Sequence, residues 1–238
     1  MTRVPRLTVA SYNAHYGRDR RGRSFDVAEV CAALDADLLV IQESWLPDDS
    51  ESAVDRAAAR LGYQVRHVPM GPARVSGRKP RLVTKGHGQG MLVISMLSRL
   101  SVRSESVIEM PSMPMDAAPR RFALRTDVEV DGSVFAFIGT HLDHLTHGSP
   151  IPLRHLMRQL PGVEQPAALA GDMNMWGPVL SALTPGWSSA GRGRTWPNPR
   201  PHSQIDHVVV NRDVHADGFE VFRVGASDHL PIRASLHY

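Results

Sequence analysis

Several polar side chains stand where predicted strands end, or in one case inside a strand, and their types could support hydrolytic chemistry. The set mixes carboxylates, carboxamides and imidazoles: Asn13, Glu43, His141, Asp172, Asn174, Asp206, Asp228 and His229. A single polar residue at such a position carries little information, because Asp and Asn also favour turns. A group of this composition, mounted on rigid strand ends that can face a common mouth, indicates a catalytic site.

The elements that would hold these residues are short strands separated by a few helices. Apolar alternation and buried runs predict strands at residues 7–12, 37–41, 63–68, 91–97, 102–108, 122–130, 134–140, 167–170, 205–210, 219–224 and 232–236. Helical spacing predicts helices at residues 25–34, 48–61, 153–160 and 179–183, the second capped by Asp49 or Ser50. Asp131-Gly132 is typical of a tight hairpin turn, and residues 69–89 are expected to form a long Gly/Pro/Arg loop.

Length and composition restrict the class of protein. The 238 residues, 42% hydrophobic and 21% charged, suffice for one large domain and exclude wholesale disorder. The lone cysteine excludes a disulfide framework and a cysteine-based zinc site. No apolar run approaches the roughly 20 residues of a spanning helix, and the start of the chain lacks the features of a secretory signal. We expect a single catalytic domain over residues 1–238, monomeric and cytoplasmic, without stable insertion into a membrane.

Basic residues are unevenly distributed, although the formal net charge is only +3. No Asp or Glu occurs between Arg56 and Arg103, a segment that contains eight arginines and lysines, and a second basic cluster lies at residues 18–23. Such patches suit an anionic, phosphate-bearing partner. The same residues could equally form a solvated arginine-rich loop, so charge alone leaves both interpretations open.

Six short motifs occur in order along nearly the whole chain. They are Ser11-Tyr12-Asn13, Ile41-Gln42-Glu43, Gly139-Thr140-His141-Leu142, Gly171-Asp172-Met173-Asn174, Ser203-Gln204-Ile205-Asp206-His207 and Ser227-Asp228-His229-Leu230-Pro231, with Thr195-Trp196-Pro197 ahead of the fifth. Each motif alone is weak, but the ordered set resembles the endonuclease/exonuclease/phosphatase superfamily, which has the deoxyribonuclease I-like fold. The resemblance implies an α/β protein with a four-layer αββα sandwich, in which two mainly antiparallel β-sheets pack face to face with helices outside.

The resemblance also implies hydrolysis of a phosphate ester with Mg²⁺, or Mn²⁺, as the cofactor. A phosphodiester is anionic and repels hydroxide, so its cleavage needs a hard cation held by oxygen ligands. Glu43 and Asp228 are the expected carboxylate ligands, with Asn13 as a neutral oxygen ligand or as a residue that positions one. This small set fits Mg²⁺, which keeps several waters and uses one or two protein carboxylates.

The remaining polar residues of the motifs are expected to act on the phosphate and the attacking water. Asp172 would deprotonate the water, and Asn174, two residues on along extended backbone, would point the same way and donate to the water or a phosphoryl oxygen. His229 would contact the phosphate, while Asp206 fixes its tautomer and favours its cationic form. His141 would serve as a leaving-group acid or as a phosphate donor.

Other residues are candidates for substrate binding. Tryptophan rings could stack on nucleobases or pack against the sandwich, and both interpretations stay open for the two tryptophans in this set. The remaining histidines, His15 among them, are expected to be surface or packing residues. The substrate-binding candidates are His144, Arg78, Arg81, Trp176 and Trp196.

The leading interpretation is a Mg²⁺-dependent phosphodiesterase, with a nuclease acting on DNA or RNA preferred. The alternatives are a phosphatase or a lipid head-group phosphodiesterase of the sphingomyelinase or inositol-phosphatase type, because scaffold and metal site do not choose between substrates. Residues 140–147 partly resemble the zinc motif of the metallo-β-lactamase family, but the first histidine of that motif would fall at Gly139, which has no ligating side chain. A metallo-β-lactamase-like zinc hydrolase and a non-catalytic nucleic-acid binder are therefore remote alternatives.

Overall fold

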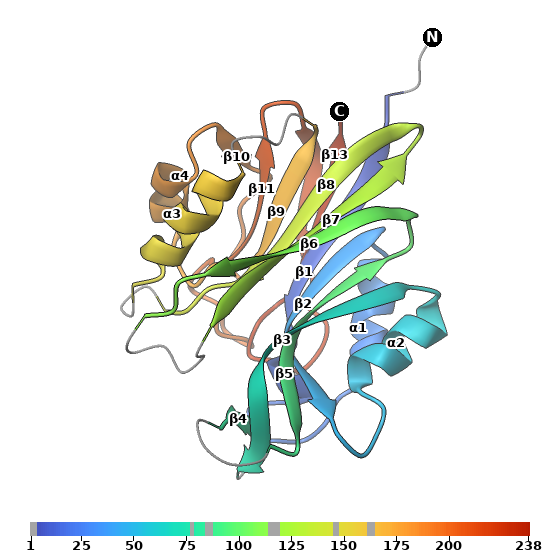
Figure 1. Ribbon diagram of the computed structural model, residues 1–238, viewed down its shortest axis with the longest axis vertical. Coiled ribbons are helices and arrows are strands. Elements are labelled where there is room, and N and C mark those ends of the chain that lie inside the picture. Colours follow the sequence, from blue (N-terminus) through green and yellow to red (C-terminus); the bar gives the residue numbers. More distant parts are fainter. Residues whose placement is uncertain (1–3, 77–78, 84–87, 114–119, 145–147, 161–164) are drawn as a thin grey trace.

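Two β-sheets packed face to face form the centre of the molecule, with helices on both outer faces (Figure 1). The computed structural model describes residues 4–76, 79–83, 88–113, 120–144, 148–160 and 165–238. α1 (Val27–Leu34) and α2 (Ala53–Leu61) cover one sheet, and α3 (Pro150–Gln159) and α4 (Gly177–Leu183) cover the other. None of the described helices is long and apolar enough to span a bilayer. The arrangement confirms the predicted four-layer αββα sandwich.

Each sheet is antiparallel except for one parallel pair of strands. The strand bounds are β1 Arg6–Asn13, β2 Leu38–Pro47, β3 Gln64–Ser76, β4 Lys79–Leu82, β5 Gly90–Ser98, β6 Val102–Met110, β7 Arg121–Val130, β8 Ser133–His141, β9 Ala167–Asp172, β10 Trp187–Ser189, β11 Asp206–Asn211, β12 His215–Val221 and β13 Ile232–His237. The first sheet has the order β12-β13-β1-β2-β5-β3-β4, and its parallel pair is β1 with β2. The second has the order β10-β11-β9-β8-β7-β6, and its parallel pair is β8 with β9.

Three apolar clusters hold the layers together. One fills the space between the two sheets, a second lies beneath α1 and α2, and a third lies beneath α3 and α4. Gly139 of β8 faces the opposite sheet at close range, because a Cβ built there would lie 2.6 Å from Cγ2 of Val40 and 2.9 Å from Cε of Met96. The separation of the sheets at this level therefore requires a residue without a side chain, two positions before His141.

Helix α2 starts later than its apolar pattern predicts. The helix expected over residues 48–61 begins at Ala53, because its N-cap is Ser52 and neither Asp49 nor Ser50. Oγ of Ser52 accepts a hydrogen bond from the backbone N–H of Asp55 (3.0 Å) and donates one to Oδ2 of Asp55 (2.6 Å). This reciprocal capping satisfies a backbone donor that the first turn of a helix otherwise leaves unpaired.

The expectation of a long loop at residues 69–89 is wrong for most of its length. β3 continues to Ser76 and pairs with β4 in an antiparallel hairpin, in which Arg74 lies opposite Arg81. Two of the three prolines that suggested a loop occupy permissive places: Pro69 adjoins a β-bulge, and Pro80 lies on the edge strand β4. Residues 77–78 and 84–87, which include Arg78, lie outside the described residues.

The hairpin predicted at Asp131-Gly132 is confirmed. Both residues have left-handed backbones (φ 48° and 83°), as a type I′ turn requires, and they connect β7 to β8. The right-handed twist of such a turn matches that of the flanking strands, so it fixes the register of β8, the strand that ends at His141.

Candidate active site

The two parallel strand pairs bring polar strand ends to one edge of the sandwich. β1 ends at Asn13 beside Gln42 of β2, and β8 ends at His141 opposite Asp172, the last residue of β9. Asp206, the first residue of β11, also pairs with Asp172. Because the carboxyl ends of parallel strands meet at the same edge, each sheet delivers side chains to this place without a long loop.

A cavity of about 380 Å³ opens at this edge. Asn13 and Asp206 are buried behind its wall, where each contacts a residue of the lining. The structure therefore brings together residues from both sheets and from both ends of the chain. Six of the residues predicted to act in catalysis or metal binding line the cavity itself: Glu43, His141, Asp172, Asn174, Asp228 and His229.

Asn13 links two carboxylates of the site. Its Nδ2 donates to Oε1 of Glu43 (3.2 Å) and to Oδ2 of Asp172 (3.0 Å). Its Oδ1 accepts from the backbone N–H of His15 (3.1 Å). Of the two roles expected for Asn13, this geometry favours positioning Glu43 and Asp172 over ligating a cation.

Glu43 has the features of a metal ligand. It lies at a β-bulge in β2 with a left-handed backbone (φ 50°), a conformation that is costly for a residue with a side chain. Its Oε2 is buried and has no hydrogen-bond partner within the described part of the chain. An unpaired buried carboxylate oxygen is expensive, and Asp228 lines the same cavity. Glu43 and Asp228 thus present carboxylates, the ligand type of a hard divalent cation, to one cavity.

His229 lies between two carboxylates. Its Nδ1 is 3.0 and 3.1 Å from the two carboxylate oxygens of Asp206, and its Nε2 is 3.7 Å from Oδ2 of Asp172. Burial lowers the pKa of His229, but the charges of Asp206 and Asp172 outweigh burial and raise the pKa to about 10. The ring is therefore held as a cation, with Nδ1 engaged by Asp206 and Nε2 on the side of Asp172.

Asp172 is the central carboxylate of the site and is almost fully buried. Burial raises its pKa to about 7, although His229 and the hydrogen bond from Asn13 act in the opposite direction. Nε2 of His141 lies 3.7 Å from Oδ2 of Asp172, as does Nε2 of His229. A carboxylate that titrates near neutrality is suited to exchange a proton with water.

The surroundings of His141 favour its neutral form. Burial lowers its pKa well below the usual value, and the Arg121 guanidinium lowers it further. Arg121 is only 5% exposed, its Nη1 donates to the carbonyl of His141 (3.3 Å), and its Nη2 is 3.4 Å from Oδ1 of Asp143. A neutral imidazole beside a buried guanidinium suits hydrogen bonding to an anionic group in the cavity.

Asn174 differs from its expected geometry. β9 ends at Asp172 and Asn174 has a left-handed backbone (φ 49°), so the two residues do not share an extended strand. The backbone N–H of Asn174 donates to Oδ1 of Asp172 (2.9 Å), and its Nδ2 donates to the carbonyl of Leu142 (2.9 Å). Both side chains reach the cavity through this hydrogen-bonded turn and not through strand alternation.

The predicted substrate-binding residues divide into two groups. His144 and Trp196 line the cavity. Trp176 is 56% exposed and lines a separate surface pocket, and Arg81 lies on the exposed side of β4 outside the lining. Arg78 lies outside the described residues.

The predicted site omits four polar residues of the lining: His15, Tyr16, Arg121 and Asp143. His15, expected to be a surface or packing residue, lies at the cavity wall. The Tyr16 hydroxyl interacts with the Glu43 carboxylate, and burial together with that negative charge raises the Tyr16 pKa. A signal for the first three exists in the sequence, because His15 and Tyr16 directly follow the first motif and Arg121 begins the strand that pairs with β8.

Comparisons with known proteins concern the family and the fold of the chain. The sequence profile of the endonuclease/exonuclease/phosphatase family matches residues 10–229. None of the curated protein sequences matches the chain.

Solved structures resemble the chain over nearly its whole length. An endonuclease/exonuclease/phosphatase from Beutenbergia cavernae has a TM-score of 0.81 at 20% identity, covering 98% of this chain and 72% of that one. A mannosyl-6-phosphatase from Bacteroides thetaiotaomicron has a TM-score of 0.71 at 17% identity, covering 98% and 100%. The human nocturnin catalytic domain, with bound sulfate, has a TM-score of 0.70 at 18% identity, covering 98% and 95%. At these identities the similarities show a shared fold.

Proposed function

This chain belongs to the endonuclease/exonuclease/phosphatase family of phosphoester-hydrolysing enzymes, and from that premise we propose that it is a Mg²⁺-dependent phosphodiesterase whose substrate is nucleic acid. The observation that carries the proposal is the convergence of Glu43, Asp172 and His229 on one cavity. This set supplies an unpaired carboxylate oxygen for a cation, a proton acceptor and a cationic donor. Hydrolysis of an anionic ester requires these three functions.

Glu43 and Asp228 are the proposed ligands of the cation. When bound, the cation neutralises charge that develops on the phosphate. Asn13 positions the ligand and the base together, because one amide nitrogen donates to both Glu43 and Asp172. Tyr16 adds a second contact to the Glu43 carboxylate. The ligand is thus held from two sides before substrate arrives.

Proton transfer is assigned to Asp172 and charge stabilisation to His229. Asp172 accepts a proton from the water that attacks phosphorus, and the backbone N–H of Asn174 holds the other carboxylate oxygen in place. His229 donates from Nε2 to a phosphoryl oxygen, where negative charge increases in the transition state. Asp206 orients the ring and keeps it cationic from the opposite nitrogen.

His141 and Arg121 form a second group of donors on the cavity wall. Arg121 offers guanidinium N–H donors, and His141 in its neutral form can donate from one ring nitrogen. Both face the phosphate position from the second sheet, opposite Glu43 of the first sheet. The substrate phosphate would therefore be bound at the edge of the sandwich, between side chains from the two sheets.

Features around the cavity favour an extended anionic substrate over a small ester. Arg74 and Arg81 lie opposite each other on the exposed β3–β4 hairpin. Leu82, at the end of β4, lines the cavity, so the hairpin adjoins the site. Trp196 in the lining offers a ring on which a base can stack.

An activity panel tests the proposal. The purified protein is incubated with Mg²⁺ or with EDTA on single-stranded DNA, double-stranded DNA, RNA, sphingomyelin, inositol phosphates and mannose 6-phosphate. We expect Mg²⁺-dependent cleavage of nucleic acid that falls steeply with salt, and loss of cleavage but not of binding in Asp172→Asn. Turnover of only the lipid or the small esters would refute the nucleic-acid substrate, and activity retained in Asp172→Asn would refute the assigned base.

A further inference from the structure

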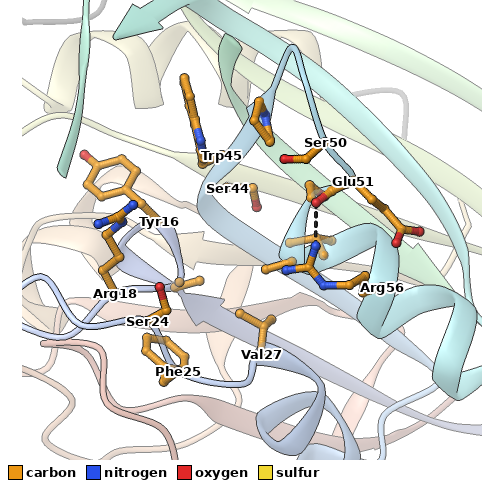
Figure 2. Close-up of a pocket in the computed structure, with 16 residues that line it drawn as sticks. Tyr16, Arg18, Ser24, Phe25, Val27, Ser44, Trp45, Ser50, Glu51 and Arg56 are labelled. Atoms are coloured by element: carbon orange, nitrogen blue, oxygen red, sulfur yellow. Dashed lines mark hydrogen bonds between the residues drawn. The ribbon is translucent and has the colours of Figure 1, made fainter. Parts of the chain in front are cut away.

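A second cavity of about 230 Å³ lies beside the active site and shares Tyr16 with it. Its walls come from the segment after β1, the end of β2 and the start of α2. Figure 2 shows Tyr16 and Arg18 on the side opposite Arg56, with Trp45 above and Ser44 between them. Glu43, the proposed cation ligand, and Ser44 are neighbours in sequence, and they line the two different cavities. We call the second cavity the ring pocket.

The wall between the two cavities has a strained backbone. His15, Tyr16 and Gly17 follow one another with left-handed φ values of 43°, 63° and 69°. Two consecutive left-handed residues with side chains are unfavourable, and such strain persists where the surrounding structure imposes it, often at functional sites. Here the strain places the Tyr16 ring between the ring pocket and the active-site cavity, with its hydroxyl at Glu43.

The ring pocket is rich in aromatic residues. Tyr16, Phe25 and Trp45 belong to its lining. Two arginines also line it, and Nη1 of each donates to a backbone carbonyl, Arg18 to Gly22 and Arg56 to Glu51. The three aromatic residues favour a flat group as the occupant, because rings stack on one another and on a guanidinium.

The pocket is also fixed in advance and large enough for such a group. Gly90 lies against the Trp45 ring, and a Cβ at position 90 would be 2.8 Å from Cη2 of Trp45. This contact supports the ring from behind. An engineered cavity of roughly 150 Å³ already binds benzene, so the observed volume can hold the ring of a nucleobase. Oγ of Ser44 donates to the carbonyl of Ile41 (3.3 Å) and keeps its acceptor side for a polar ring edge.

We propose that the ring pocket binds the nucleobase of the nucleotide whose phosphate is cleaved, with Trp45 and Tyr16 as its main contacts. This inference rests on the proposed function, since it supplies a specificity site for the same reaction. It makes the enzyme selective for nucleotide esters over esters without a base. It also assigns the strained turn a role, because Tyr16 holds the base on one side and the cation ligand on the other.

Two diesters with the same leaving group test the proposal. Thymidine 5′-(4-nitrophenyl) phosphate carries a base, and methyl 4-nitrophenyl phosphate does not. Stacking on one ring implies that the wild type prefers the thymidine ester by roughly 5- to 150-fold in kcat/KM. In Trp45→Ala this preference should collapse toward one, because kcat/KM should fall much further for the thymidine ester than for the methyl ester. Trp45→Phe is the matched control, and it should keep most of the preference because it retains a ring.

A binding measurement separates failure of this inference from failure of the proposed function. In EDTA, thymidine 5′-phosphate and 2-deoxyribose 5-phosphate are titrated into the wild type, Trp45→Ala and Trp45→Phe by calorimetry, with thermal melting to verify folding. Tighter binding of the thymidine ligand, lost only in Trp45→Ala, supports the ring pocket even if neither diester is cleaved. Equal binding of both ligands by the wild type, or a preference that survives Trp45→Ala, overturns it even if nucleic acid is cleaved.

Discussion

Replacing Asp206 with Asn tests whether a buried charge controls the ring of His229. Asp206 is 1% exposed, and both its carboxylate oxygens lie within 3.1 Å of Nδ1 of His229. Asn has nearly the same size, so the substitution removes the negative charge and leaves the packing. Removing one partner of a buried pair typically costs about 3–5 kcal/mol of folding stability. A similar change beside a catalytic histidine lowers kcat by about 10⁴-fold. We expect kcat/KM to fall by roughly 10²- to 10⁴-fold.

A double-mutant cycle provides the assay. Asp206→Asn, His229→Gln and the double variant are compared with the wild type at saturating Mg²⁺, with thermal melting to verify that each is folded. Once His229 is gone, Asp206 has no ring to orient, so Asp206→Asn should cost less than about tenfold in that background. The reasoning is refuted if the two substitutions act additively, or if Asp206→Asn retains the kcat/KM of the wild type.

Three further predictions concern the metal, the second donor group and the cap of α2. Glu43→Gln should raise the Mg²⁺ concentration for half-maximal activity at least about tenfold without changing the melting temperature in EDTA; an unchanged Mg²⁺ titration contradicts the ligand role. Arg121→Met should lower kcat/KM by about 10- to 100-fold at an unchanged Mg²⁺ requirement. If steady-state assays give Arg121→Lys the same low kcat/KM as Arg121→Met, an effect of the positive charge is contradicted. Burial raises the pKa of Asp55, but hydrogen bonds from Ser52 and His67 outweigh burial and lower the pKa. The ionised carboxylate therefore stabilises the fold at neutral pH. This contribution is lost as the pH falls through the lowered pKa. Asp55→Asn should therefore cost about 1 kcal/mol at pH 7 and less at pH 3, and urea unfolding that gives equal losses at both pH values would contradict this.

Much of the site can be predicted because its residues stand at strand ends, where side-chain type is informative. A carboxylate in an apolar strand, such as Asp206, needs a charged partner, and the structure supplies His229. The positions of Asp172 and His141 at strand ends follow from the same pattern, and for them the local sequence and the tertiary arrangement agree. Glu43, expected at the end of its strand, lies at a bulge inside β2, which continues to Pro47.

Other features depend on contacts that no local pattern reports. Arg121 is a site residue because β7 pairs with β8 and brings it to His141, and a strand that begins with arginine looks like an ordinary surface strand. Asn174 turns away from the extended direction because its backbone N–H finds the Asp172 carboxylate. Tyr16 owes its place to an unfavourable backbone conformation, which average residue preferences predict against.

The same distinction explains the errors in the fold. Pro80 tolerates a strand only because β4 is at an edge, and edge position is a property of the whole sheet. The start of α2 is decided by which hydroxyl reaches the Asp55 N–H, and several residues before Ala53 are suitable capping types.

Gly139 links the spacing between the two sheets to the geometry of the active site. Position 139 rests on Val40 and Met96 across the sandwich, and the same strands carry Glu43 and His141 from opposite sides of the phosphate position. A methyl group at position 139 would clash with Val40 and Met96 and push the two sheets apart. The distances from Glu43 on one sheet to His141 and Arg121 on the other would then increase. The width of the site therefore depends on residues 40, 96 and 139, none of which lines the cavity.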